Sequence, residues 1–213
     1  MMHWVERGPE PDGLQGVRAR RTPAWIAHYR GKTGPKPSDS DWRDFAKELE
    51  GRFSDLCGYC EETTEGEVDH FRPKKVFPES VYEWWNWVFA CHTCNHSKGE
   101  KWPDGGYVDP CVLSEEEKPE RFFAYDLESG FIIPMVGLDV EQDARARQMI
   151  KDLRLNLLFH LKNRLFWLDM LRDFLLRNTR KDDWERLWTR FAQPGVPLSS
   201  WSTAMLRQYR PSP

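Results

Sequence analysis

The sequence predicts an α+β protein in which a small, cysteine-bound core lies between an N-terminal helical arm and a mainly helical C-terminal region. Two observations predict the core: a pair of C-x-x-C motifs and, between them, the alternating stretch EVDHF, which is typical of a short strand. A third predicts the C-terminal region, where apolar residues recur every three to four positions. We therefore divide the chain into 1–50, 51–110 and 111–213.

Composition limits the class of protein. The 213 residues are 39% hydrophobic and 31% charged, which suits a folded domain. No apolar run is long enough to span a bilayer and the polar N-terminus lacks a signal-peptide core, so we expect a cytoplasmic protein with no membrane partner.

The charge is unevenly distributed along the chain, although its net value is only −3. Seven basic and four acidic side chains give +3 over 1–39, and twelve basic and six acidic give +6 over 151–213. Twelve basic and twenty-four acidic side chains give −12 over 40–150. The acidic middle alone should bind nucleic acid weakly, so the basic ends are candidates to compensate.

In the arm, residues 1–39 are rich in Pro, Gly and Arg and include one short helical candidate at 23–30. We expect little core from this stretch. Ser40 or Asp41 can cap a second helix that runs to about residue 55. Its apolar positions share one face at helical spacing: Trp42, Phe45, Ala46, Leu49 and Phe53.

The remaining elements follow from turn signals and periodicity. The strand at 67–71 precedes an aromatic turn or helix at 81–86 and a short helix at 92–98 that Gly99 closes. Residues 100–120 are expected to form a loop, and a hairpin turns at Glu128-Ser129-Gly130. Helices are predicted at about 139–153, 157–177, 182–192 and 198–208.

The second of these helices carries a leucine stripe that predicts a core face: Leu158, Leu161, Leu165, Leu168, Leu171 and Leu175. Lys162, Arg164 and Arg172 flank the stripe and predict a basic face for phosphate or for an acidic partner. A solvated helix surface is the alternative. The aromatic cluster Trp184, Trp188, Phe191 and Trp201 favours a partner interface.

The most specific pattern in the sequence is a pair of metal-binding cysteine motifs. Cys57 and Cys60 form one C-x-x-C pair and Cys91 and Cys94 the other, with thirty residues between them. Each pair places two thiolates on one face of a tetrahedral ion, so we predict a structural zinc site. Cys111 stands apart and should be dispensable for zinc.

Polar residues around these cysteines suggest chemistry. Asp69-His70 lies on the predicted strand, Asn86 lies five residues before the second pair, and Asn95 and Lys98 follow it. The pattern C-x-x-C … DH … N … C-x-x-C-N-x-x-K resembles the HNH endonuclease family, with Asn rather than His in the third position. The resemblance implies a ββα-metal fold, a hairpin followed by a helix with a metal ion held between them.

The resemblance also implies roles. Asp69 and the Asn95 amide oxygen would bind a catalytic Mg²⁺ or Mn²⁺, since phosphodiester cleavage needs an activated water and a counter-charge. His70 would be the general base and Asn86 would pin the loop that orients it. Arg72 and Lys98 would contact phosphates of the substrate. Three further polar residues are weaker candidates: Glu67, which could hold a metal-bound water, and His92 and His96, which we expect to be exposed.

Three functions stay open: a DNA endonuclease, which we favour, an RNase acting on tRNA or other structured RNA, and a non-catalytic zinc adaptor. An adaptor would have no need of Asp69, His70 and Asn95 together. A longer pattern is similar to the PtuB-type HNH proteins of Septu and retron-associated antiphage defence, and runs through HWVERGPEPDGL, LCGYCEE, VDHFRPK, NWVFACHTCNHSKG, YVDPC and IKDLRLN. It implies a nuclease effector with an ABC-type ATPase as its partner.

Overall fold

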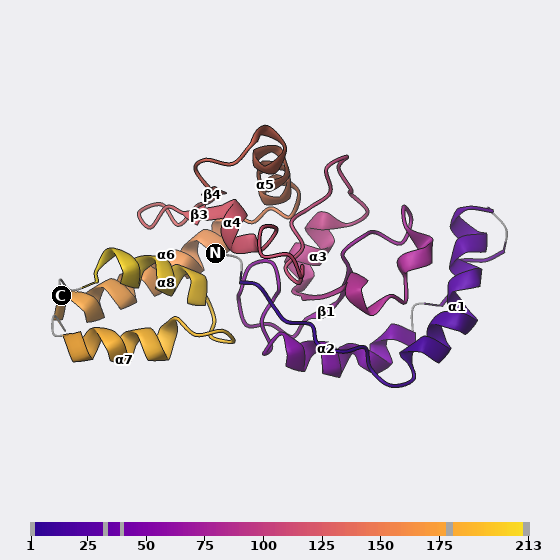
Figure 1. Ribbon diagram of the computed structural model, residues 1–213, viewed down its shortest axis with the longest axis horizontal. Coiled ribbons are helices and arrows are strands. Elements are labelled where there is room, and N and C mark those ends of the chain that lie inside the picture. The colour runs from indigo at the N-terminus through magenta and orange to yellow at the C-terminus, as the bar shows by residue number, and fades with distance from the viewer. Residues whose placement is uncertain (1–2, 32–33, 39–40, 178–180, 211–213) are drawn as a thin grey trace.

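The computed structural model describes residues 3–31, 34–38, 41–177 and 181–210. The molecule is elongated, with helix α1 (Leu14–Tyr29) at one end of its long axis and the C-terminal helices at the other (Figure 1). The cysteine-bearing core lies between them. The α+β class is confirmed, because helices surround two small antiparallel sheets of two strands each.

The N-terminal helix is longer and better packed than predicted. It begins at Leu14, directly after the left-handed Gly13, and continues through Pro23. Proline usually begins or breaks a helix, so the sequence placed the start at residue 23 instead. Trp25 is fully buried and packs against Trp42, so the expectation of an arm with little core was wrong.

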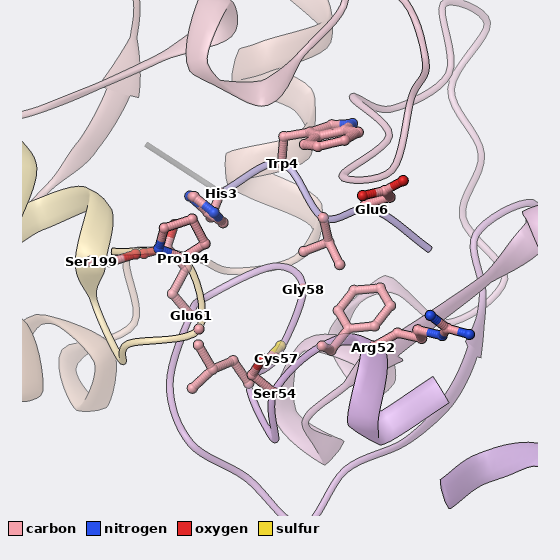
Figure 2. A pocket seen from close by; sticks show the side chains of 14 residues that line it. His3, Trp4, Glu6, Arg52, Ser54, Cys57, Gly58, Glu61, Pro194 and Ser199 are labelled. Atoms are coloured by element: carbon pink, nitrogen blue, oxygen red, sulfur yellow. The ribbon is translucent and has the colours of Figure 1, made fainter. Parts of the chain in front are cut away.

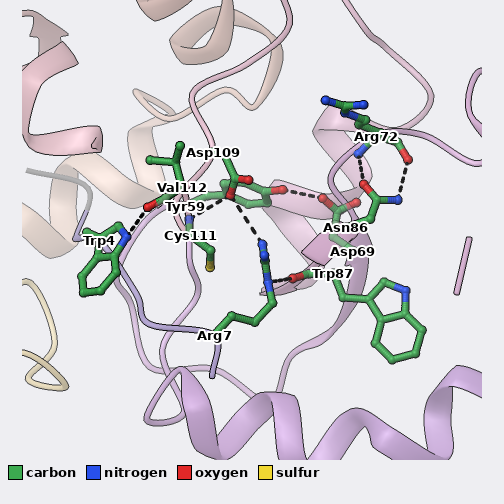
Figure 3. A network of polar contacts seen from close by, with 10 residues as sticks. All are labelled: Trp4, Arg7, Tyr59, Asp69, Arg72, Asn86, Trp87, Asp109, Cys111 and Val112. Carbon is green, nitrogen blue, oxygen red and sulfur yellow. Dashed lines mark hydrogen bonds and ion pairs between the residues drawn. The ribbon is translucent and has the colours of Figure 1, made fainter. Parts of the chain in front are cut away.

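The segment before α1 is also tied to the core. Val5 N–H donates to the Pro110 carbonyl at 2.8 Å, and Trp4 Nε1 donates to the Val112 carbonyl. The buried Arg7 donates from Nε to the Trp87 carbonyl at 2.9 Å (Figure 3). These bonds fasten the chain start across the core and the loop after residue 108.

The second predicted helix is split into a 3₁₀ turn, η1 (Asp41–Phe45), and α2 (Ala46–Arg52). It ends earlier than expected because Ser54 and Asp55 have left-handed backbones, with φ of 53° and 59°. The expected inner face is confirmed at Trp42, Leu49 and Phe53, which are buried. Ser40 lies outside the described residues.

The core is a hairpin followed by a helix. Strand β1 (Glu67–His70) pairs antiparallel with β2 (Trp87–Ala90), and His70 lies opposite Trp87. Two 3₁₀ turns, η2 (Pro78–Ser80) and η3 (Trp84–Asn86), connect the strands.

Helix α3 (His92–Lys98) follows β2 directly, and both its ends are determined by local chemistry. The Cys91 sulfur caps its start by accepting from Cys94 N–H, and Gly99 ends it with φ of 54°. The predicted strand, short helix and closing glycine are confirmed. Hairpin plus helix give the ββα arrangement.

The C-terminal half matches its predicted elements except at residues 119–122, where a loop and the start of a strand were expected and a short helix forms. A short helix, α4 (Pro119–Phe122), precedes the hairpin of β3 (Phe123–Tyr125) and β4 (Ile132–Pro134). Four helices follow: α5 (Val140–Asp152), α6 (Leu158–Arg177), α7 (Lys181–Phe191) and α8 (Ser199–Gln208). Asp139 and Gln142 form a capping box that determines where α5 begins. No helix among the described residues is long and apolar enough to cross a bilayer.

Two expectations about these helices were wrong. Leu168, Leu171 and Leu175 are buried, but Leu158 at the start of the stripe is 65% exposed. Arg164, predicted on the basic outer face, is fully buried. The inner face of α6 therefore begins with polar residues rather than leucine.

The C-terminal aromatic cluster packs within the chain, with Trp201 buried and Trp184, Trp188 and Phe191 partly buried against the core. Trp201 is 1% exposed, Trp184 Nε1 donates to the Leu206 carbonyl at 2.8 Å, and Phe191 packs edge-on against Trp167. These contacts join α6, α7 and α8 to one another. The cluster is needed for packing within the chain, so it gives no support to the predicted partner interface.

The helices also attach to the core. Leu198 N–H donates to the Glu61 carbonyl, and Ser200, 139 residues from Glu61, donates from both N–H and Oγ to the Glu61 carboxylate. Glu61 directly follows Cys60, so the start of α8 is anchored beside a cysteine pair.

Candidate metal centre and active site

The four paired cysteines converge on one point. The Sγ atoms of Cys57, Cys60, Cys91 and Cys94 all lie within 4.8 Å of one another, and those of Cys60 and Cys91 are 3.9 Å apart. Tetrahedral zinc with bonds of about 2.3 Å to sulfur separates its ligands by roughly 3.8 Å. The donor set therefore fits a structural Zn²⁺, as the spacing predicted.

Local structure delivers each pair to this point. The first cysteine turn, residues 57–60, follows α2 and is anchored to the sheet because Gly58 N–H donates to the Phe89 carbonyl at 2.8 Å. The second cysteine turn, residues 91–94, is the start of α3. Hydrogen bonds from Cys57, Cys60 and Cys94 lower the pKa of the Cys91 thiol strongly, which favours the thiolate that a metal needs.

Cys111 is not part of the cluster. Its thiol is buried, and burial raises its pKa to about 12. It stays protonated at neutral pH.

His70, the predicted general base, is held at the end of β1 inside an aromatic cage. Trp42 lies edge-on to its ring with centroids 4.8 Å apart. Nε2 lies 2.8 Å from the Val81 carbonyl oxygen, which can only accept, so Nε2 carries the proton and Nδ1 keeps its lone pair. Burial, with help from Lys74 and Lys98, holds the pKa of His70 well below its usual value. The ring is neutral at pH 7, as a base must be.

Asn86 is fully buried and clamps the loop between the strands (Figure 3). Its Oδ1 accepts from Arg72 N–H at 2.7 Å, and its Nδ2 donates to the carbonyls of Arg72 and Ser80 at 3.1 and 2.9 Å. Ser80 immediately precedes Val81, the acceptor for His70. The side chain thus holds in place the loop that orients the imidazole, which supports the predicted positioning role.

Asp69 is buried, and both of its carboxylate oxygens have partners. Tyr59, from inside the first cysteine turn, donates to Oδ2 at 2.5 Å (Figure 3). Lys98 Nζ donates to Oδ1 at 2.9 Å and also to the His70 carbonyl at 2.7 Å. The carboxylate is thus neutralised and oriented from two sides.

Asp69 and His70 share one small cavity of about 70 Å³. The residues that line it are Asp69, His70, Pro73, Lys74, Lys75, Gly99 and Glu100. A neutral imidazole, a carboxylate and two lysines around a space that admits water are groups that can activate water beside an anion.

The structure differs from the sequence expectation at Lys98 and Asn95. Lys98 is 1% exposed and neutralises Asp69, so it reaches no phosphate at the surface. Asn95 lies one turn earlier on α3, half-buried, and does not line the cavity. The burial of Lys98 and the position of Asn95 depend on tertiary neighbours, because helical spacing in the sequence does not show how deeply a side chain is buried.

The other candidates lie nearer the surface. Arg72 is exposed, with its guanidinium over the Trp85 ring at 5.1 Å, where it can meet a phosphate. Glu67 lies 3.4 Å from His92 and does not line the cavity. His92 and His96 are exposed, as expected, and stack on each other.

Sequence reasoning missed Tyr59 and Lys74. Lys74 Nζ lies over the Trp42 ring at 4.3 Å and lines the cavity beside His70. Tyr59 stands within C57-G-Y-C60, and an aromatic residue with a hydroxyl between two ligands was the one available signal.

A larger cavity, of about 350 Å³, adjoins the first cysteine turn (Figure 2). It is lined by the chain start, by residues around Arg52 and Cys57, and by the loop before α8, but by neither Asp69 nor His70. It is separate from the cavity that holds the candidate base.

Comparison with known proteins agrees with this geometry. None of the curated proteins matches the chain. A protein-family model does match, over the segment that begins at the first cysteine turn and ends just after α3. Residues 57–101 match the model of the HNH endonuclease family, and the four cysteines positioned to bind zinc all lie within that segment.

Proposed function

We propose that this chain is a metal-dependent HNH nuclease that hydrolyses phosphodiester bonds in DNA. One observation carries the proposal: within the matched segment, a neutral His70 whose Nδ1 keeps its lone pair shares a cavity with Asp69. A structural zinc module has no need of a buried, oriented imidazole next to a carboxylate.

His70 acts as the general base in this proposal. Its Nδ1 accepts a proton from the attacking water, while the Val81 carbonyl holds Nε2–H and orients the ring. Asn86 keeps that carbonyl in place through Ser80. Arg72, exposed above Trp85, binds a phosphate of the substrate.

Carboxylate and amide oxygens are the donors that a hard divalent ion prefers. The carboxylate of Asp69 lines the cavity, whereas Asn95, on the adjacent helix, does not, so its amide oxygen can be the proposed second donor only if the side chain turns toward the cavity. Mg²⁺ or Mn²⁺ bound there would supply counter-charge for the phosphate and the leaving oxygen. Lys98 supplies the positive charge at Asp69 in this structure, and we withdraw it as a phosphate ligand.

A biological setting is proposed from the longer sequence pattern. Its similarity to PtuB-type proteins supports a role as the nuclease effector of a bacterial antiphage defence complex, partnered by an ABC-type ATPase. The basic residues that remain exposed on α6, such as Lys162, are candidates for that contact. Co-purification of the chain with the products of its neighbouring genes tests this part.

The activity is tested by incubating purified protein with plasmid DNA and with total RNA, each with and without Mg²⁺ or Mn²⁺. We expect metal-dependent cleavage of DNA that is lost in His70→Ala. His28→Ala, which removes an imidazole outside the cavity, is the matched control and should cut normally.

Each alternative predicts a different result in the same assay. Cleavage of RNA alone would identify the RNase. Binding without cleavage of either substrate, or full activity of His70→Ala in a preparation free of other nucleases, would contradict the proposal.

A further inference from the structure

Two buried polar side chains on α6 have no role in the proposed cleavage reaction. His160 and Arg164 lie four positions apart, hence on one face of the helix, and both are 0% exposed. A buried guanidinium is costly unless negative charge faces it. The charge that these two residues face therefore indicates what they do.

His160 lies beside the first cysteine turn. Its Nδ1 is 2.9 Å from Glu62 Oε1, and Glu62 is two residues beyond Cys60. One ring nitrogen, a Glu62 oxygen and the Cys60 sulfur all lie within 4.8 Å of one another. Nε2 is buried and has no hydrogen-bond partner among the described residues. Polar groups placed next to the ligands of a metal orient those ligands and tune the site.

Arg164 lies one helical turn further along α6 and interacts electrostatically with the first cysteine turn. Its Nη1 donates to the Gly130 carbonyl and to Asn156 Oδ1, both at 3.3 Å, and its guanidinium lies over the Trp201 ring at 5.0 Å. Nε and Nη2 have no partner among the described residues. Burial lowers the pKa of Arg164, and the negative groups that oppose this are Cys60, Glu62, Glu61 and Cys94.

The zinc centre carries a net negative charge that a buried cation such as Arg164 can balance. Four thiolates around one Zn²⁺ carry a net charge of −2, and Glu61 and Glu62 follow the first cysteine turn immediately. Glu61 already accepts hydrogen bonds from Ser200, whereas the charge of the thiolates can be offset by a buried cation. Arg164 can balance the thiolates, and Glu62 holds the His160 ring in place beside Cys60.

We propose that α6 provides the outer shell of the zinc centre, in which Arg164 balances the thiolate charge and His160, oriented by Glu62, supports Cys60. Neither residue is a zinc ligand. The C-terminal helices are thereby fastened to the metal, about a hundred residues along the chain from the cysteines. This inference uses the zinc assignment and is independent of nuclease activity.

The first experiment measures how fast zinc leaves the purified holoprotein into a chromophoric chelator. Arg164→Met and His160→Ala should release zinc about ten- to a hundredfold faster than the unsubstituted chain. Arg164→Lys, which keeps the charge, should lie close to wild type. Lys162→Met removes an exposed cation from the same helix and should change the rate less than twofold. Equal rates for Lys162→Met, Arg164→Met and His160→Ala would overturn the proposal.

The second experiment separates outer-shell residues from ligands. Co²⁺ is substituted for zinc, and the visible spectrum is recorded for wild type and His160→Ala. We expect the bands of four-thiolate coordination in both. A wild-type spectrum that indicates three sulfurs and one nitrogen, or bands that change their coordination pattern in His160→Ala, would make His160 a ligand and contradict the proposal.

The third experiment needs no substitution, in case Arg164→Met fails to fold. Zinc is withdrawn from the wild-type chain in steps, and hydrogen exchange is followed over α6, α7 and α8. We expect exchange at the start of α6 and α8 to rise before exchange in α7 does, and to be reversed when zinc is restored; a simultaneous rise everywhere would count against the proposal. Unchanged exchange there after zinc removal would overturn the link between α6 and the metal.

Discussion

Lys98 Nζ lies 2.9 Å from Asp69 Oδ1, and the two side chains are 1% and 3% exposed. The pair joins α3 to β1 at the cavity that also holds His70. The ammonium of Lys98 already neutralises the Asp69 carboxylate, which the proposed divalent ion would also bind. The ion and Lys98 therefore compete for Asp69.

Removing the ammonium leaves a buried carboxylate without its counter-charge. Lys98→Met should lower the free energy of unfolding by about 3–5 kcal/mol in the absence of divalent ions. Chemical denaturation measures the loss. If Asp69 binds the proposed ion, Mn²⁺ should restore more stability to this variant than it adds to wild type.

Lys75→Met is the matched control, because Lys75 lies on the same cavity but pairs with Glu100 at the exposed surface. Its loss of stability should be much smaller than that of Lys98→Met, because solvent screens an exposed ion pair. A Lys98→Met variant as stable as Lys75→Met would show that the buried pair contributes little.

The hydroxyl of Tyr59 connects the first cysteine turn to the carboxylate of Asp69. Tyr59→Phe removes the donor to Asp69 Oδ2 and should cost about 1.5–3 kcal/mol in stability, with zinc content unchanged. Cleavage should weaken as the carboxylate loses its orientation. Tyr125→Phe is the control, because the buried Tyr125 hydroxyl has no partner among the described residues and its loss should be neutral. Equal stability of the two variants would remove Tyr59 from the site.

Activity should persist into mildly acid solution. The proposed base must be neutral, and burial holds the pKa of His70 well below 6.5, so the rate should fall only as pH drops through that lowered pKa. Lys74→Met removes one cause of the lowered pKa of His70, so the fall in rate on acidification should begin at a higher pH. Lys75 is not a cause of the lowered pKa, so Lys75→Met should leave the acid side of the pH profile unchanged. Single-turnover rates against pH give the answer, and an acid limb at 6.5 or above in wild type would contradict the assignment.

The same shift predicts how stability depends on pH. A histidine whose pKa is lower in the folded state binds its proton more readily in the unfolded chain. The contribution of His70 to stability is thus fully present above about pH 6.5 and falls as the solution is acidified toward the folded pKa. Denaturation of His70→Ala should lack this component.

Asn86→Ala should impair cleavage without loss of zinc. Three hydrogen bonds to Arg72 and Ser80 disappear, so the Val81 carbonyl is no longer held against His70. A displacement of about 1 Å can lower a rate roughly a hundredfold. The single-turnover rate and the zinc content are measured together. Normal cleavage would leave Asn86 with no part in orienting the base.

Zinc should be required for folding, with one ion per chain. Cys57→Ser should give insoluble or unfolded protein, because a core this small depends on its metal. Cys111→Ser should fold with full zinc content. In the native chain Cys111 should also resist alkylation at neutral pH, because its pKa is about 12 and it is buried. Elemental analysis without zinc would refute the assignment.

The features predicted well from sequence are those that spacing encodes. Two cysteine pairs, an alternating strand and a helix closed by Gly99 each carry a local signature, and all three are present. The periodic C-terminal helices were predicted for the same reason.

The features missed depend on neighbours far along the chain. Lys98 is buried because Asp69, 29 residues earlier, faces it, and His160 is buried against Glu62, 98 residues away. Nothing in the sequence around α6 distinguishes the buried Arg164 from the exposed Lys162. Pro23 misled the prediction of α1 for another reason: a local rule about proline was overridden by the burial of Trp25.

The bonds from Ser200 to Glu61 have a consequence during synthesis. A ribosome must add 139 more residues after Glu61 before the partner of that carboxylate exists. Contacts so distant in sequence close late and slow the search for the native state. A nascent chain that has completed its cysteine turns and its hairpin still lacks the helices that cover them, so the finished centre should form only after translation has passed α8.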